Sequence, residues 1–139
     1  MRLTKKAAAG IPIRLTAVFI VLTLSIPLLA NSMERTETDM AAAELGNEMG
    51  RVVDAASVVY FSGSGSSKTI VVDVPPGCEI RMGDHSGDRY RMGGYRNGMK
   101  IAEACIESPT FPIFGGATLT GCCEIVLRNA GAGVEVSAT

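Results

Sequence analysis

The 139-residue sequence has no tryptophan, a single histidine and only 5% aromatic residues. It also lacks the marks of common enzymes, with no nucleophile elbow, no CxxC or HxxxH metal spacing and no paired-carboxylate site. Scattered arginines in an acidic body do not form the basic stripe that nucleic acid requires. No N-x-[ST] glycosylation acceptor is present. We therefore expect a non-enzymatic protein with no metal, no cofactor and no nucleic-acid partner.

Acidic residues are absent from the first thirty positions, whose only charges are Arg2, Lys5, Lys6 and Arg14. The rest of the chain contains the other nine of the 13 basic residues and all 14 acidic ones, so its net charge is −5. A cationic head, an apolar stretch and an acidic remainder are typical of an exported protein. The basic head predicts that the N-terminus lies on the cytoplasmic side of the membrane and the body on the outer side.

Residues 15–30 form an uncharged apolar stretch, "LTAVFIVLTLSIPLLA". Sixteen helical residues cover only about 24 Å of the roughly 30 Å hydrocarbon core, so we extend the predicted transmembrane helix to residues 11–30. A buried core helix is disfavoured, because nothing else in the chain is apolar enough to surround it. Three fates stay open: a signal peptide cut after Ala30, an uncut anchor, or a cut within "KKAAAGIPIRL", before the apolar run.

Residues 31–62 predict an amphipathic helix. Its apolar positions recur at steps of four and three, which place them on one helical face. This predicted packing face consists of Leu45, Met49, Val52, Ala56 and Val59, and Met40 is expected to extend it backwards. Asn31-Ser32 either caps a new helix or lies within one continuous helix.

The following segment, "FSGSGSSKTIVV", resembles a phosphate-binding loop only superficially. Ser67 rather than glycine precedes Lys68, and the loop leaves a helix and enters a strand, the reverse of a P-loop. We interpret residues 63–68 as a Gly/Ser hinge.

Residues 69–139 predict a small β domain of six or seven strands. Strands are expected at 69–74, 78–82, 89–92, 99–106, 117–129 and 133–138, with a turn over 93–98 and a proline-containing edge or loop over 108–116. The predicted fold class is thus α+β: a basic leader (1–10), a transmembrane helix (11–30), an amphipathic helix (31–62), a hinge (63–68) and an exported, antiparallel, sandwich-like β domain (69–139).

All four cysteines lie in the predicted exported domain, where an even number favours disulfides. Bonding Cys122 to its neighbour Cys123 would strain the chain. The expected bridges therefore join Cys78 to one member of this pair and Cys105 to the other. A metal site that includes His85 has no supporting spacing, and we expect His85 to be an exposed turn residue.

Together these segments resemble archaeal type IV pilin-like and archaellin-like proteins. The similarity is most specific in "VVYFSGSGSSKTIVVDVPPGCEI" and "GCCEIVLRNAGAGVEVS". The resemblance implies cleavage by a prepilin-type peptidase between Gly10 and Ile11, with Lys5 and Lys6 as leader charges. It also implies self-association, or association with other pilin-like subunits, in a surface filament. The sequence departs from the bacterial pattern, which has glutamate five positions into the mature chain, where Leu15 stands here. The alternative is a single-span cell-surface protein whose β domain binds a partner without polymerising.

Overall fold

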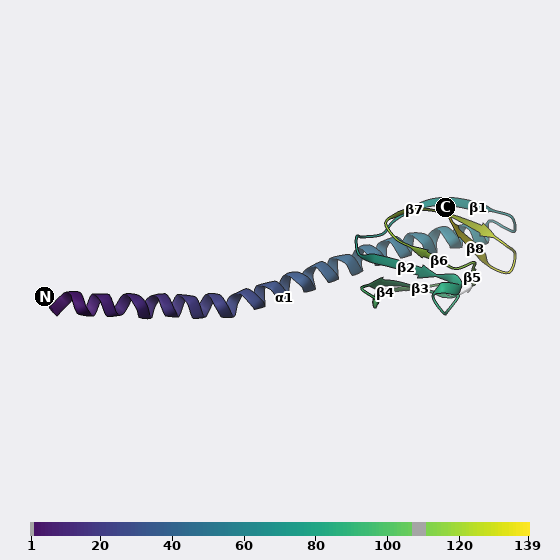
Figure 1. The fold of residues 1–139 in the computed structure, drawn as a ribbon. Coiled ribbons are helices and arrows are strands. Elements are labelled where there is room, and N and C mark those ends of the chain that lie inside the picture. The colour runs from purple at the N-terminus through teal and green to yellow at the C-terminus, as the bar shows by residue number, and fades with distance from the viewer. Residues whose placement is uncertain (1, 107–110) are drawn as a thin grey trace. The chain divides into compact units, whose positions relative to one another are not determined.

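A computed structural model describes the backbone of residues 2–106 and 111–139, and side chains from residue 12 onward (Figure 1). One long helix, α1 (Arg2–Phe61), precedes all of the strands. The chain divides into two compact units that meet at Glu37 and Thr38, and each is described by itself. The fold class is α+β, as the sequence predicts.

The first unit consists of the N-terminal part of α1. Helix α1 continues through Asn31 and Ser32, so these residues do not cap a new helix. Pro12 and Pro27 both lie inside α1. A proline in a helix removes one backbone hydrogen bond, and tolerance of this loss is common in helices that cross membranes.

The second unit combines the C-terminal part of α1 with two four-stranded sheets. The first sheet has the order β1-β7-β8-β5 and the second has the order β4-β3-β2-β6. All neighbouring strands are antiparallel except β5 and β8, which are parallel. The strand bounds are β1 Ser67–Asp73, β2 Cys78–Met82, β3 Arg91–Arg96, β4 Met99–Cys105, β5 Ile113–Phe114, β6 Ala117–Leu119, β7 Cys122–Asn129 and β8 Val134–Ala138.

One hydrophobic core joins the C-terminal part of α1 to both sheets. Figure 1 shows the strands of both sheets gathered around this part of the helix. All five residues of the predicted packing face are buried there. Met40 does not extend this face, because it is 60% exposed and Ala41 is buried instead. The reason is geometric: Ala41 lies four residues before Leu45 and shares its side of the helix, whereas Met40 lies five before it.

Alternating strand residues supply the rest of the core. Cys78, Ile80 and Met82 are buried on one face of β2, as the alternation in "CEIRM" predicts. In β7, Ile125 and Leu127 are buried and Cys123 is half-buried.

The turn predicted over residues 93–98 is shorter than expected, because β3 continues to Arg96. Only Asn97 and Gly98 form the turn, both with positive φ (51° and 77°), the geometry of a type I′ hairpin. Gly94 lies within the strand, and a Cβ there would stand 3.0 Å from Leu45 Cδ1. This glycine therefore allows β3 to approach α1 closely.

The segment predicted as a hinge is a hydrogen-bonded turn that leads directly into β1. Gly63 and Gly65 have positive φ, and the Gly65 N–H donates to the Asn129 carbonyl at 3.0 Å. The strand begins at Ser67, so the last two residues of the predicted hinge belong to β1. In the segment 108–116, residues 108–110 lie outside the described part. Beyond them, β5 lies at the edge of its sheet, which is where its neighbouring Pro112 is tolerated.

Candidate functional site

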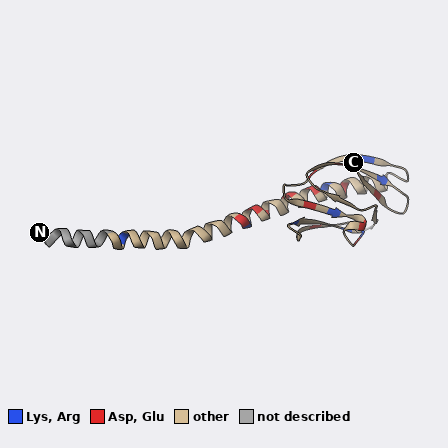
Figure 2. Ribbon diagram, viewed as in Figure 1, with Lys and Arg blue, Asp and Glu red and all other residues tan. Residues whose placement is uncertain are grey.

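The apolar stretch of α1 is exposed on all sides in the structure. Among the side chains that the structure describes, eighteen large hydrophobic residues are exposed, and eleven of them lie between positions 13 and 29. The most apolar 18-residue window has a mean hydropathy of 2.2, and none of it is buried. By length and composition, this helix can cross a membrane. In Figure 2 the stretch is almost entirely tan, and acidic residues begin only beyond it.

The hydroxyl groups of this stretch are satisfied within the helix. Thr16, Thr23 and Ser25 each donate a 2.7 Å hydrogen bond to the carbonyl four residues earlier. An unsatisfied donor is costly in hydrocarbon, and this pattern removes that cost. The stretch therefore presents an almost wholly apolar surface.

The predicted processing site lies within α1. Lys5, Lys6, Gly10 and Ile11 all have helical backbone. Their side chains lie outside the described part of the structure, and cleavage between Gly10 and Ile11 stays a prediction.

The predicted disulfides are not formed: Cys78, Cys105, Cys122 and Cys123 are all free. Cys105 ends β4 in one sheet, and Cys122 begins β7 in the other. Cys78 is buried at the start of β2, and the Cys123 thiol donates to the Thr120 carbonyl at 2.9 Å. The even count of cysteines predicted bridges without information on which strands share a sheet, and this is why the expectation fails.

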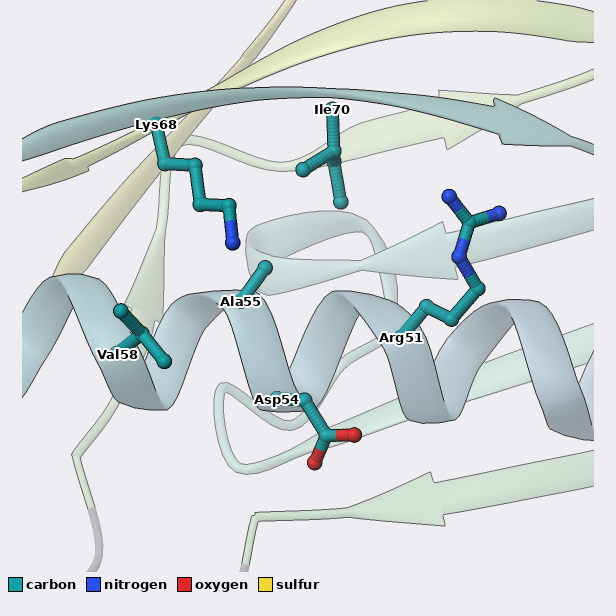
Figure 3. A pocket seen from close by; sticks show the side chains of 6 residues that line it. All are labelled: Arg51, Asp54, Ala55, Val58, Lys68 and Ile70. Atoms are coloured by element: carbon teal, nitrogen blue, oxygen red, sulfur yellow. The ribbon is translucent and has the colours of Figure 1, made fainter.

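A shallow groove of about 350 Å³ lies between α1 and the edge strand β1. It is lined by Arg51, Asp54, Ala55, Val58, Lys68 and Ile70. Figure 3 shows Lys68 and Ile70 reaching from β1 toward the helix, with Ala55 facing them and Asp54 directed away. The groove thus combines an apolar floor with the cationic side chains of Arg51 and Lys68.

Glu48 connects α1 to the free edge of β1. Its Oε2 accepts the Asp73 backbone N–H at 3.1 Å, and both of its oxygens accept from Arg51 Nη1 at 2.9 Å. The carboxylate thereby occupies one position that a neighbouring strand would otherwise fill. Among the described residues, no carboxylate forms an ion pair with Lys68.

Asn129 is a buried polar residue that the sequence analysis missed. It is 4% exposed, and its Nδ2 donates to the carbonyls of Tyr60 at 2.8 Å and Val59 at 3.3 Å. Its Oδ1 accepts the Gly131 N–H at 2.8 Å. The side chain therefore ties the end of α1 to the turn between β7 and β8. One signal could have revealed it: Asn129 continues the alternation of Ile125 and Leu127 and so falls on the buried face.

The second sheet presents a charged strand, β4, at its free edge. Glu103 pairs with Lys100 at 3.0 Å and with Arg91 at 3.3 Å. The hydrogen bond from Lys100, followed by the charges of Lys100 and Arg91, lowers the pKa of Glu103 below its ordinary value. Glu103 is therefore ionised at neutral pH.

His85 is exposed in a short 3₁₀ helix after β2, with Nδ1 3.1 Å from Thr118 Oγ1. Within residues 2–106 and 111–139, no group of three or more His, Cys, Asp or Glu residues is arranged to hold a metal ion.

Comparisons with family models, curated proteins and solved structures found no match to this chain.

Proposed function

We propose that this protein is a pilin-like subunit, or a minor component, of an archaeal surface filament, anchored by its N-terminal helix. Its role is structural rather than enzymatic, and its β domain is a sandwich-like head on the outer side of the membrane. A prepilin-type peptidase cleaves it between Gly10 and Ile11, after the leader charges Lys5 and Lys6.

One observation carries this proposal: a single helix has two kinds of surface along its length. Between positions 13 and 29 its large apolar side chains are exposed, whereas from Ala41 to Val59 its apolar face is buried in the β domain. One end of this helix can serve as a membrane anchor, and the other end forms part of the core of the β domain. This arrangement suits a pilin-like subunit, in which the anchoring helix continues into the head domain. The resemblance in "VVYFSGSGSSKTIVVDVPPGCEI" and "GCCEIVLRNAGAGVEVS" supports the same assignment.

A second candidate is a single-span cell-surface protein whose head binds a partner without polymerising. The burial of the helix face from Ala41 to Val59 favours it, because those residues are not available to pack against other copies.

The N-terminal residue of the protein isolated from its native membrane tests the proposal. A chain that starts at Ile11 supports prepilin-type processing and the filament role. A chain that starts at Met1 favours the uncut anchor and the second candidate. A start near Asn31 removes the span and refutes both.

Filament membership is tested separately by shearing surface fibres from cells. A subunit co-purifies with the fibres, whereas a solitary anchored protein stays with the detergent-extracted membrane as a monomer or small oligomer.

A further inference from the structure

Strand β1 is one of two seven-residue strands that lie at the edge of a sheet in the described part of the chain. Such an edge has unpaired backbone groups that can pair with a strand of another molecule, and proteins commonly protect it. The edge strands β5 and β6 have only two and three residues, and strands this short pair poorly. The longer edge of β1 needs protection by other means, and two charged side chains stand beside it.

Alternate residues of β1 direct their backbone N–H groups to the free edge. The Val74 N–H, directly after the strand, donates to the Gly121 carbonyl, so the even-numbered N–H groups face β7. The odd-numbered ones point away from β7, as the bond from the Asp73 N–H to Glu48 shows. A strand added to this edge would therefore pair with the N–H groups of Asp73 and of the odd-numbered residues before it.

Glu48 occupies the place of an added strand at one end of this edge. Its Oε2 is 3.1 Å from the Asp73 nitrogen, whereas neighbouring strands in a sheet lie about 4.8 Å apart. The carboxylate therefore fills the space beside β1 and takes the hydrogen bond that an added strand would make. Arg51 holds it there, because its Nη1 donates to both carboxylate oxygens at 2.9 Å.

Lys68 protects the other end of the edge by pointing inward. It is paired with the buried Leu127 of β7, so the two side chains share the face of the sheet that is directed at the core. Figure 3 shows Lys68 reaching into the groove beside α1, next to Ile70, while Asp54 is directed away. A strand added here would cover the groove and enclose an ammonium group that has no carboxylate partner among the described residues. Enclosing an unpaired charge is costly, so Lys68 opposes strand addition.

We propose that Glu48 and Lys68 close the free edge of β1 to strand addition and so keep the β domains of different copies from joining edge to edge. An open edge of this length would promote association between copies that are anchored in the same membrane. The inference applies to either candidate function, because the closed edge belongs to the β domain and not to the N-terminal segment. In a filament, the contacts between copies would then use other surfaces.

Removing both side chains from the full-length protein in detergent tests this inference. Serine replaces the three cysteines other than the buried Cys78, so that exposed thiols cannot link the copies. In this parent chain, Glu48→Ala combined with Lys68→Val is expected to strengthen self-association about tenfold or more, because nothing then fills the edge or resists enclosure. Sedimentation velocity over a series of protein concentrations measures the association.

Three matched variants separate the edge from a general gain in apolar surface. Arg128→Val also removes a positive charge from this sheet, but on β7, which has a neighbour on each side, and it is expected to leave association unchanged. Glu48→Gln combined with Lys68→Arg keeps an acceptor for the Asp73 N–H and the inward charge, and is expected to behave like the parent chain. Val71→Pro, added to the associating variant, removes an N–H that β7 does not use and is expected to reverse the association.

The inference is overturned if the double variant associates no more strongly than the parent chain, if Arg128→Val associates equally, or if Val71→Pro does not reverse the effect. Protection of the Cys78 thiol from labelling shows which variants are folded. If the double variant exposes this thiol, the single variants Glu48→Ala and Lys68→Val decide the test, since each is expected to give part of the increase.

These outcomes are independent of the N-terminal residue of the native protein. A chain that starts at Ile11 and shows no effect at the edge keeps the proposed function and loses this inference.

Discussion

Replacing Asn129 by alanine is expected to destabilise the β domain strongly. The substitution removes three side-chain hydrogen bonds, two to the last carbonyls of α1 and one from the Gly131 N–H. A buried polar group left without a partner costs about 1–3 kcal/mol, and water reaches some of these groups at the end of the helix. We therefore expect the free energy of unfolding to fall by about 2–4 kcal/mol, which lowers the Tm by roughly 10–25 °C in a domain of this size.

The assay is thermal unfolding of the full chain in detergent, in which labelling of the buried Cys78 thiol reports the unfolded fraction at each temperature. Serine at the other three cysteine positions makes the signal specific to the β domain. Ser137→Ala, on the exposed face of β8, is the control and is expected to change stability by less than about 0.5 kcal/mol.

Asn129→Asp provides the sharper comparison. Aspartate keeps an acceptor for the Gly131 N–H but places a carboxylate against two carbonyl oxygens, so it is expected to be at least as destabilising as alanine. If Asn129→Ala unfolds at the temperature of the Ser137→Ala control, the side chain does not hold the end of α1. If aspartate is clearly better tolerated than alanine, the donation to Val59 and Tyr60 is not the stabilising interaction.

Three further predictions concern the helix–sheet contact, the charged strand and the span. Gly94→Ala is expected to lower the free energy of unfolding by about 1–3 kcal/mol because its new methyl group meets Leu45, and by less when Leu45→Ala has removed that side chain. Urea unfolding of the two single variants and the double variant measures this coupling, and strictly additive losses would contradict the contact. The lowered pKa of Glu103 contributes stability that is present above its unfolded-state pKa and is lost as pH falls through the folded-state pKa. Glu103→Gln is therefore expected to remove this part of the pH dependence of unfolding, and an NMR titration that shows an ordinary pKa for Glu103 would refute the prediction. Leu22→Arg, in the middle of the apolar stretch, is expected to make membrane insertion less favourable by about 2.5–3.5 kcal/mol and to increase the fraction of protein that carbonate extracts from membranes. Ser32→Arg lies beyond the stretch and is expected to change neither. Equal extraction of the two variants would argue against a membrane span.

The main elements of this fold follow from periodicity in the sequence. Steps of three and four residues place Leu45 and Val59 on one helix face, and alternation places Ile80 and Met82 on one strand face, where both pairs are buried. The prediction was wrong at Met40, which is apolar but lies five residues before Leu45 and therefore off the buried face. Such patterns predict the buried face of a helix or strand reliably here, because each depends only on residues that lie close together in the sequence.

Contacts between distant residues could not be read in the same way. Asn129 meets Tyr60, and Asp73 meets Glu48, across separations of 69 and 25 residues. The glycines of "GGYRNG" predicted a turn, yet Gly94 lies in a strand, where the absence of a side chain leaves room for Leu45 of α1. The cysteine pairing failed for a related reason, since the number of cysteines says nothing about which strands become neighbours.

The distribution of apolar surface along α1 limits how copies of this chain can assemble. Exposing the four larger buried residues of the packing face, Leu45, Met49, Val52 and Val59, would cost about 6–12 kcal/mol at 1.5–3 kcal/mol each, which is as large as the whole stability of a typical domain. Helix-to-helix contact between copies therefore cannot use this buried face, whereas the large apolar side chains between positions 13 and 29 are exposed. These are the residues that lipid would cover in an anchored subunit. If the proposed filament role is correct, moving from membrane to filament exchanges lipid for neighbouring helices on one set of side chains and leaves the β domain intact.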